Sequence, residues 1–358
     1  MTKVQLRALW FQVHKWIGLL LAIILIPLSL TGSLLVWDGP LDRLLRPAHH
    51  VDAGPIALPP SAYVAAARGA LPSGSRITSL VIGEGPVMVT AMPPQAGQIP
   101  GPPQRIAAWI DPATGRVIDS GPTTSPLLRW SHVFHGSLQI PGSGRAVVGW
   151  LGVAMLISSL TGIWLWWPLT GSVTRGFRWK RQPTINANLH HLAGFWISLP
   201  LAILSLTGVI IAWPQMMGSG GMRRPMAIPL ASPHLTIDQV LAAPAKSPAT
   251  ISWPTDKDGA WTVSGGSAGS VKVADDSGMV APADPAASRD RPRPFYRRLH
   301  DGGNMGLVWQ IVIFLGGIAP ALLGVTGIIM WLRTRTWRGD VARRQAATHP
   351  GSMPFKDR

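Results

Sequence analysis

The 358-residue sequence contains no cysteine and few acidic residues. The absence of cysteine removes thiol chemistry and cysteine-ligated iron–sulfur clusters from consideration, and it suits an oxidising compartment such as the periplasm. Charged residues make up only 13% of the chain and apolar residues 47%. This balance favours a membrane protein over a string of soluble domains.

Four apolar runs of about 20 residues are each long enough to cross a hydrocarbon core of about 30 Å. None contains a charged side chain, and they extend over Ile17 to Trp37, Val147 to Trp167, Ala193 to Trp213 and Val308 to Leu332. The first run follows basic residues, as a signal peptide would, but its apolar core is too long and no small-x-small cleavage site follows. The sequence therefore predicts four transmembrane helices, the first of them retained.

Basic residues gather in the short segments beside these runs. Residues 1–15, the loop 169–189 and the tail from Arg333 hold 14 Lys and Arg but only two acidic residues. The two long connections hold 18 Lys and Arg against 14 Asp and Glu. The positive-inside rule predicts a bacterial inner-membrane protein with both termini in the cytoplasm and both long connections in the periplasm. Because the basic excess flanks apolar spans, it does not indicate nucleic-acid binding.

The chain repeats itself. In the first and third spans, a Thr-Gly pair lies 17 residues after a histidine, with His14 before Thr31 and His190 before Thr207. In the second and fourth spans the offset is 26 residues, with His135 before Thr161 and His300 before Thr326. Both halves cross the membrane with the same polarity. The pattern therefore predicts a parallel repeat of a two-helix unit, related by an axis along the membrane normal.

The two long connections also resemble each other. In the first, residues 58–66 predict a short helix, and residues 77–92 and 107–117 predict strands with a turn at Asp111 to Gly115. In the second, residues 235–243 predict the helix and residues 271–280 the strand and turn. We expect an all-α four-helix transmembrane bundle with two periplasmic α+β modules. The expected order is N-terminus and first span 1–37, module 38–146, span 147–168, cytoplasmic loop and start of the third span 169–192, span 193–213, module 214–307, span 308–332 and cytoplasmic tail 333–358.

The turn Asp111-Pro-Ala-Thr-Gly-Arg-Val117, the His-x-x-x-Gly starts at His14 and His190, and the Ser-Leu-Thr-Gly motifs together resemble the PepSY-associated transmembrane family. The resemblance covers nearly the whole chain, although the second module has Asp275-Asp-Ser-Gly-Met-Val at the turn. That family includes inner-membrane ferric-siderophore reductases that hold two b-type haems between four helices. The resemblance implies a di-haem electron conduit whose external modules are PepSY domains.

The histidines can be judged without the family. His14 and His190 lie at the cytoplasmic ends of their spans, and His135 and His300 lie at the periplasmic ends. A neutral imidazole is a good axial ligand for haem iron. Histidine is uncommon near a transmembrane span because its polar ring must be satisfied there, so its presence indicates a function. Repeat symmetry lets each half supply one ligand, so the pairs His14 with His190 and His135 with His300 predict two bis-histidine haems. Interfacial anchoring or a divalent-metal site are the alternatives, but the spans offer no acidic residue or cysteine to complete a metal site.

Several nearby residues leave alternatives open. His132, three residues before His135, is an alternative ligand, and His191 is a propionate partner or a core residue. His49, His50, His234 and His349 are expected at the surface. A basic stretch before His300 could pair with haem propionates, attract an anionic ferric complex, or form a solvated linker near headgroups; its arginines are Arg289, Arg291, Arg293, Arg297 and Arg298.

These features predict an electron-transfer membrane enzyme with no catalytic side chains beyond the haem ligands. A cytoplasmic protein or a membrane quinol would supply electrons, because the chain has no flavin or nicotinamide motif. The acceptor would be a periplasmic ferric siderophore, which releases iron on reduction because Fe(II) binds hard oxygen donors less tightly. The alternatives are a non-enzymatic PepSY membrane protein that binds or regulates partners, and a haem or iron permease.

Overall fold

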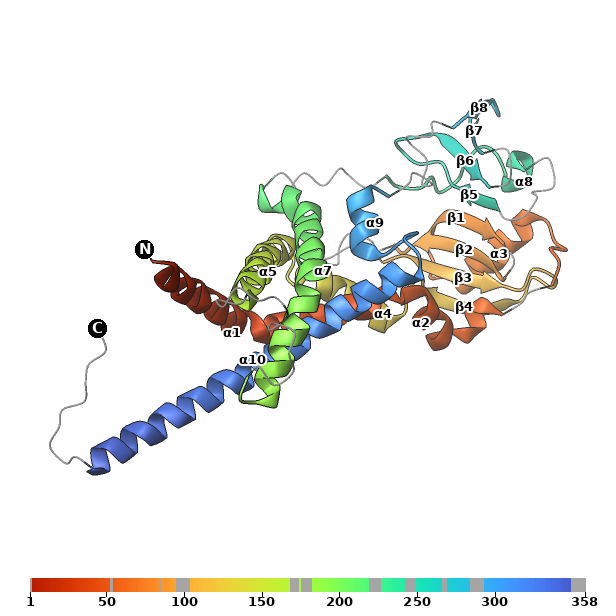
Figure 1. Cartoon of the computed structure of the whole chain (residues 1–358). Coiled ribbons are helices and arrows are strands. Elements are labelled where there is room, and N and C mark those ends of the chain that lie inside the picture. The colour runs from red at the N-terminus through yellow and green to blue at the C-terminus, as the bar shows by residue number, and fades with distance from the viewer. Residues whose placement is uncertain are drawn as a thin grey trace. The chain divides into compact units, whose positions relative to one another are not determined.

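The computed structural model describes residues 2–51, 54–83, 85–94, 104–167, 174, 182–218, 227–241, 249–265, 269–283 and 293–348. They form two compact units. One comprises residues 1–36, 134–219 and 294–358, and the other residues 37–133 and 220–293 (Figure 1). Most of the predicted cytoplasmic loop, together with Arg289, Arg291 and His349, lies outside the described residues or the described side chains.

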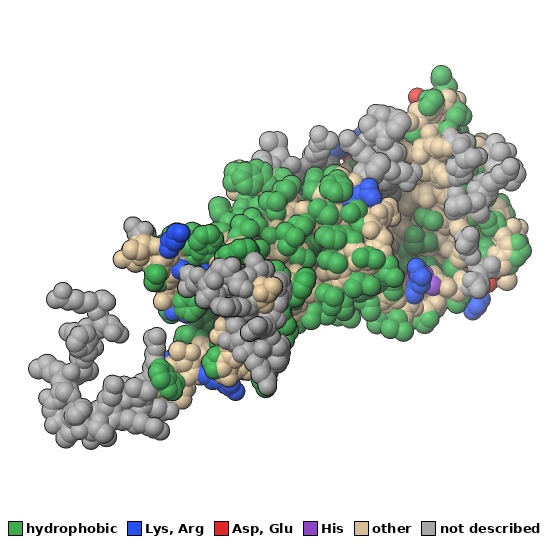
Figure 2. Space-filling view, viewed as in Figure 1, with side chains coloured by type: hydrophobic (Ala, Val, Ile, Leu, Met, Phe, Trp, Pro, Cys, Tyr) green, Lys and Arg blue, Asp and Glu red, His purple; other side chains and the backbone are tan. Residues whose placement is uncertain are grey.

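The first unit contains the four predicted transmembrane helices. They are α1 (Lys3–Val36), α5 (Gly144–Trp166), α7 (Ile185–Met216) and α10 (Leu307–Thr348), and each is long and apolar enough to cross a membrane. Helices α7 and α10 contain their whole apolar runs, and α1 and α5 each end one residue before theirs. Apolar side chains cover the visible face of these helices (Figure 2), as a lipid-facing surface requires. The prediction of four spans, and hence of a multi-pass membrane protein, is confirmed.

The spanning helices pack as a ring in the order α1, α5, α7, α10 and back to α1. In this ring α1 lies opposite α7, and α5 lies opposite α10. Small residues allow close approach at two of the contacts. A Cβ atom on Gly149 would lie 2.4 Å from the Met216 sulfur, and one on Gly317 would lie 2.0 Å from the Ser33 hydroxyl oxygen. Close packing through small residues is typical of helices in membranes.

Two short helices precede the second and fourth spans. They are α4 (Pro126–Ser137) and α9 (Phe295–Asp301). Left-handed backbone at Leu138, Gln139 and Gly142 separates α4 from α5, and left-handed Gly302 ends α9. The prediction that His135 and His300 lie at the ends of the spanning helices is wrong. Each lies on its own helix, because the chain must turn between that helix and the span.

The second unit contains one antiparallel sheet in the order β4-β3-β2-β1-β5-β6-β7-β8 (Figure 1). The long connection after the first span supplies β1 (Arg76–Ile82), β2 (Val87–Met92), β3 (Ile106–Ile110) and β4 (Val117–Pro122). The other connection supplies β5 (Ala249–Ser252), β6 (Ala260–Ser264), β7 (Ser270–Ala274) and β8 (Val280–Pro282).

The two predicted modules are therefore two halves of a single sheet. They join where β1 pairs with β5, from Ser79 opposite Ser252 to Ile82 opposite Ala249. Separate modules would each expose an unpaired edge strand there, and pairing satisfies both edges. The predicted strand of residues 77–92 is a hairpin of β1 and β2, and β5 and β6 were not predicted.

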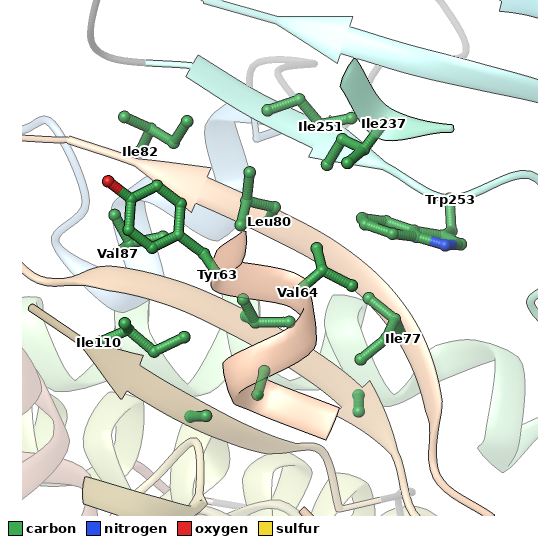
Figure 3. Packing of buried hydrophobic residues seen from close by; sticks show 14 of the residues in the cluster. Tyr63, Val64, Ile77, Leu80, Ile82, Val87, Ile110, Ile237, Ile251 and Trp253 are labelled. Carbon is green, nitrogen blue, oxygen red and sulfur yellow. The ribbon is translucent and has the colours of Figure 1, made fainter. Parts of the chain in front are cut away.

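One hydrophobic core serves both halves. Tyr63 and Val64 of α3 (Pro60–Ala70) lie against the sheet together with Leu80 of β1 and Ile251 of β5 (Figure 3). From the second half, α8 (Ile237–Val240) adds Ile237 to the same core. The helix predicted over residues 235–243 is confirmed only in these four residues.

Two further short helices follow the first span, namely α2 (Asp38–Leu45) and the 3₁₀ helix η1 (Pro47–His50). His49 of η1 was expected at the surface and is instead buried, at 8% exposure. Its Nε2 atom lies 2.6 Å from the Asp119 carboxylate, and its ring stacks on Trp109 at 3.6 Å between centroids. The stacking partner and the ion-pair partner lie far along the chain, so local polarity gave no sign of this burial.

Candidate functional site

Two histidines from opposite helices of the ring lie close together. His14 of α1 and His190 of α7 have ring centroids 6.5 Å apart and ring planes at 85°. The helices that carry them lie on opposite sides of the ring, so the imidazoles approach through its interior. The sequence predicted this pair, and the structure brings the two residues together.

The second predicted pair has a similar spacing. His135 of α4 and His300 of α9 have ring centroids 6.3 Å apart, and their planes form an angle of 41°. These short helices precede α5 and α10, which also lie opposite each other. Both pairs therefore combine one residue from each half of the chain.

Each of the four imidazoles contacts a segment of another helix that contains a Thr-Gly pair. We call this segment, which consists of the Thr-Gly pair and the helix turn before it, an imidazole seat. At the seat in α5, Nδ1 of His14 lies 3.1 Å from the Ser158 carbonyl oxygen and 3.1 Å from the Thr161 hydroxyl oxygen. The Thr161 hydroxyl donates to carbonyls of its own helix. It therefore accepts from the imidazole, as the Ser158 carbonyl does.

The other three seats repeat this arrangement. Nδ1 of His300 donates to the Leu204 carbonyl at 3.1 Å and to the Thr207 hydroxyl at 3.0 Å. Nδ1 of His190 lies 3.0 Å from the Thr326 hydroxyl, which also donates to its own helix. Nδ1 of His135 donates to the Leu28 carbonyl at 2.8 Å.

The glycine of each seat lies against the Cε1 atom of the imidazole. A Cβ atom built on the glycine would lie only 2.6 to 3.6 Å from that carbon. The distances are 2.6 Å for Gly32 and His135, 3.2 Å for Gly208 and His300, 3.4 Å for Gly162 and His14, and 3.6 Å for Gly327 and His190. The Thr-Gly pairs were recognised at fixed offsets from the histidines, but their contact with the imidazoles was not predicted. The equal offsets between histidine and threonine were the available signal.

These contacts determine the state of the ring. Since the partners of Nδ1 are hydrogen-bond acceptors, Nδ1 carries the proton of the neutral imidazole. The lone pair then lies on Nε2, the nitrogen that can bind a metal. A carbonyl that accepts from Nδ1 also fixes ring orientation and increases the basicity of a ligating imidazole.

The family model for the PepSY-associated TM region matches residues 11–334 of the chain. The chain belongs to the PepSY-associated transmembrane family. The match begins before His14 and ends after the seat at Thr326, so all four histidines and all four seats of this PepSY-family chain lie within it. None of the curated proteins compared with the chain matches it.

The spacing of each pair fits two axial ligands of one iron. Two imidazole nitrogens bound to the same metal ion at about 2 Å each leave the ring centroids about 6 Å apart. The separations of 6.5 and 6.3 Å agree with this estimate. A zinc site would need three or four protein ligands, and the described part of the PepSY-family chain contains no cluster of three His, Cys, Asp or Glu suited to a metal. Two ligands per centre match haem, whose macrocycle supplies the remaining donors.

The alternative ligands lie outside the pairs. His132 is exposed and its Nδ1 donates to Leu128 of its own helix at 3.1 Å, whereas His135 on the same helix bonds to α1. The ring of His191 lies beside that of His190, with centroids 6.4 Å apart at 79°.

The arginines before His300 have varied surroundings. The Arg298 guanidinium donates to the carbonyls of Gly303 and Asn304, at 3.4 and 2.8 Å, and so supports the turn after α9. Arg297 lies on α9 three residues before His300, and Arg293 lies just before that helix. A role of Arg293, Arg297 and Arg298 toward propionates or an anionic substrate stays a prediction.

Proposed function

We propose that this PepSY-family chain is an inner-membrane electron-transfer protein that binds two b-type haems. His14 and His190 would be the axial ligands of one haem, and His135 and His300 those of the other. The observation that carries the proposal is the recurrence of one arrangement, in which the centroids of two seated imidazoles lie at the separation expected for two ligands of one iron.

Haem bound at these positions would supply one-electron redox chemistry, with a potential that depends on its ligands and their hydrogen bonds. The chain's own residues hold each imidazole in one tautomer and one orientation. The seats achieve this with a carbonyl, a hydroxyl, or both, and a glycine that permits close approach. Preorganised ligands lower the reorganisation that accompanies binding and electron transfer.

We further propose that the electron acceptor is a ferric siderophore in the periplasm. One electron converts its Fe(III) to Fe(II), which hard oxygen donors hold less tightly. The positive-inside pattern supports a cytoplasmic position for His14 and His190 and a periplasmic position for His135 and His300. Electrons would then enter at the first pair, from a cytoplasmic protein or a membrane quinol, and leave from the second.

Reduced-minus-oxidised spectra and a haem count on the purified protein test this proposal. Two haems per chain are expected. Replacement of either His14 or His190 with Ala should remove one haem, and replacement of either His135 or His300 should remove the other. The matched controls are His191→Ala and His132→Ala, which alter the neighbouring histidines and should retain two haems.

Three outcomes would contradict the proposal. Protein made with ample haem that lacks a Soret band has no haem centre. Loss of both haems from one substitution, in protein that remains folded, would show that the pairing is wrong. Uptake of iron or haem into proteoliposomes without a reductant would instead favour a permease.

A further inference from the structure

One buried hydroxyl group of α4 lacks a hydrogen-bond partner. Ser131 is 1% exposed, and its hydroxyl makes no hydrogen bond within the part of the chain that the structure describes. Buried serines of the spanning helices instead bond back to their own backbone, as Ser159 does to the Met155 carbonyl and Ser198 to the Gly194 carbonyl. A buried donor without an acceptor is costly. Ser131 therefore needs an acceptor from outside the chain.

Ser131 lies one helix turn before His135. Four residues of α-helix rise about 6 Å and return to the same face, so the hydroxyl and the imidazole lie on one side of α4. The neighbours of Ser131 lie on other faces, since Trp130 is 49% exposed and His132 is exposed as well. The acceptor that suits Ser131 is thus close to the group that His135 binds.

The same position carries a hydrogen-bond donor before each of the four paired histidines. A hydroxyl, an indole N–H and a side-chain amide can all donate without carrying a charge. We call these four residues the outer donors, and they are Trp10 before His14, Ser131 before His135, Asn186 before His190 and Tyr296 before His300. Each outer donor is four residues from its histidine and lies in the same helix.

The outer donors are turned away from the exposed surface of their helices. Each one is less exposed than the residue directly before it. The residues before them are Leu9, Trp130, Ile185 and Phe295, which are 49, 49, 75 and 65% exposed. The outer donors therefore share the inward face of the histidines and are available to a group bound between the helices.

The outer donors also lie on the aqueous side of the histidines. Helices α1 and α7 run from a short basic segment into an apolar run, and α4 and α9 lead from a long connection toward the next span. In every case the donor precedes the histidine, so it lies one turn nearer to the aqueous segment. This is the direction in which a bound group should place its ionised atoms, because charge within hydrocarbon is costly.

Haem has the matching chemistry. Its macrocycle is apolar, and its two carboxylate groups, the propionates, extend from one edge. Two axial imidazoles position the iron but leave the macrocycle free to rotate about the axis that joins them. Donors that bind the carboxylates on the aqueous side would fix that rotation. A neutral donor does so without placing a second charge beside the hydrocarbon core.

We propose, resting on the proposed function, that the outer donors bind the carboxylate groups of the two haems and set the rotation of each macrocycle. Each haem receives one outer donor from each half of the chain. Ser131 and Tyr296 serve the haem at His135 and His300. Trp10 and Asn186 serve the other haem.

Haem and its dimethyl ester separate this role from packing, because esterification removes the ionised carboxylates and leaves the iron and the macrocycle unchanged. A His14→Ala background keeps only the centre at His135 and His300. Apoprotein of this background in detergent is titrated with each ligand, and binding is followed by Soret absorbance. Ser131→Ala and Tyr296→Phe should each weaken haem binding about tenfold, the loss expected for a hydrogen bond to a charged group. Neither substitution should change the affinity for the ester.

The matched control is Ser137→Ala, which removes a hydroxyl group from the same helix. Ser137 lies two residues after His135 and so points about 200° away from it. This variant should bind haem and the ester like the His14→Ala parent.

The other centre provides an independent test. In a His135→Ala background, Trp10→Phe and Asn186→Leu should weaken haem binding and leave ester binding unchanged. The inference is overturned if the variants weaken haem and ester equally, which would indicate packing, or if they bind both ligands like the control. Parent proteins that bind neither ligand would contradict haem binding itself, whereas haem binding that is insensitive to the outer donors contradicts only this inference.

Discussion

The imidazole of His135 lies so close to Gly32 that a Cβ atom on residue 32 would be 2.6 Å from its Cε1 atom. Real Cβ atoms do not approach other carbons this closely, so any larger residue must displace the ring. Because Gly32 lies on α1 and His135 on α4, the contact fixes the position of this imidazole relative to the helix bundle. The contact thus explains why a glycine follows the threonine of this seat.

Gly32→Ala should therefore cost the protein one haem. Overpacking of this kind destabilises the local structure by about 1–3 kcal/mol, and here the movable group is the ligand itself. The haem count should fall from two toward one. Gly18→Ala is the matched control, since it lies in the same helix with nothing within 4 Å of the added atom. A Gly32→Ala protein with two unperturbed haems would contradict the role of the seat.

Thr161→Val should raise the reduction potential of the haem proposed at His14 and His190. The substitution keeps the shape of the side chain but removes the hydroxyl that lies 3.1 Å from Nδ1 of His14. A less strongly hydrogen-bonded imidazole donates less charge, so Fe(III) is less stabilised. One hydrogen bond of about 0.5–1.5 kcal/mol corresponds to a shift on the order of 20–60 mV in a redox titration. Thr161→Ser should restore the original potential; equal potentials in all three proteins would exclude this effect.

The two proposed haems should give different electron paramagnetic resonance signals. The imidazole planes are at 85° in the pair His14 and His190 but at 41° in the pair His135 and His300. Nearly perpendicular axial planes leave two iron d orbitals close in energy, which gives a strongly anisotropic low-spin signal, and smaller angles give an ordinary rhombic one. His14→Ala should remove the anisotropic signal and His135→Ala the rhombic signal. Two identical signals would show that the bound rings adopt other angles.

Asp275→Asn should destabilise the sheet unit in a pH-dependent manner. Burial raises the pKa of the Asp275 carboxyl, whereas hydrogen bonds from N–H groups of His234, Trp261 and Leu235 lower it. The hydrogen bonds have the larger combined effect, so the pKa lies below its ordinary value of 3.8. A lowered folded-state pKa stabilises the protein above the unfolded-state pKa, and this stabilisation is lost as the pH falls through the folded value. Loss of charge-assisted bonds should cost about 2 kcal/mol at neutral pH.

The measurement for Asp275 is thermal unfolding of the full chain at several pH values. The difference between the original protein and Asp275→Asn should be largest near pH 7 and should shrink below pH 3.8. Asp276→Asn is the control, because this adjacent carboxylate is exposed. A pH-independent difference would mean that the substitution acts through packing instead of charge.

The features that were predicted correctly depend on local or repeated signals. Apolar length alone located the four spans, because a membrane imposes one minimum length on every crossing helix. The matching positions of the histidines in the two halves predicted the pairs His14 with His190 and His135 with His300. Apolar length is visible within a single segment, and the repeat is visible when two segments of the same sequence are compared.

The features that were missed depend on partners far along the chain. The hydrogen-bond partner of His135 is the carbonyl of Leu28, which lies 107 residues before it in the chain. The pairing of β1 with β5 joins strands about 170 residues apart, so the chain gave no local sign of a single sheet. Asp275 looked like a departure from a turn motif. In the structure its carboxylate accepts a hydrogen bond from the indole N–H of the buried Trp261 at 2.8 Å. The buried indole needs an acceptor, which explains why an acidic residue stands at position 275.

The distribution of seats and pairs has a consequence for biogenesis. Each of the four paired histidines is seated by a helix of its own half of the chain, whereas each pair needs both halves. Half of the protein can thus prepare its ligands as soon as it enters the membrane, yet it can complete no pair until the other half arrives. Cofactor capture would then act as a checkpoint, because only a fully assembled chain could retain haem.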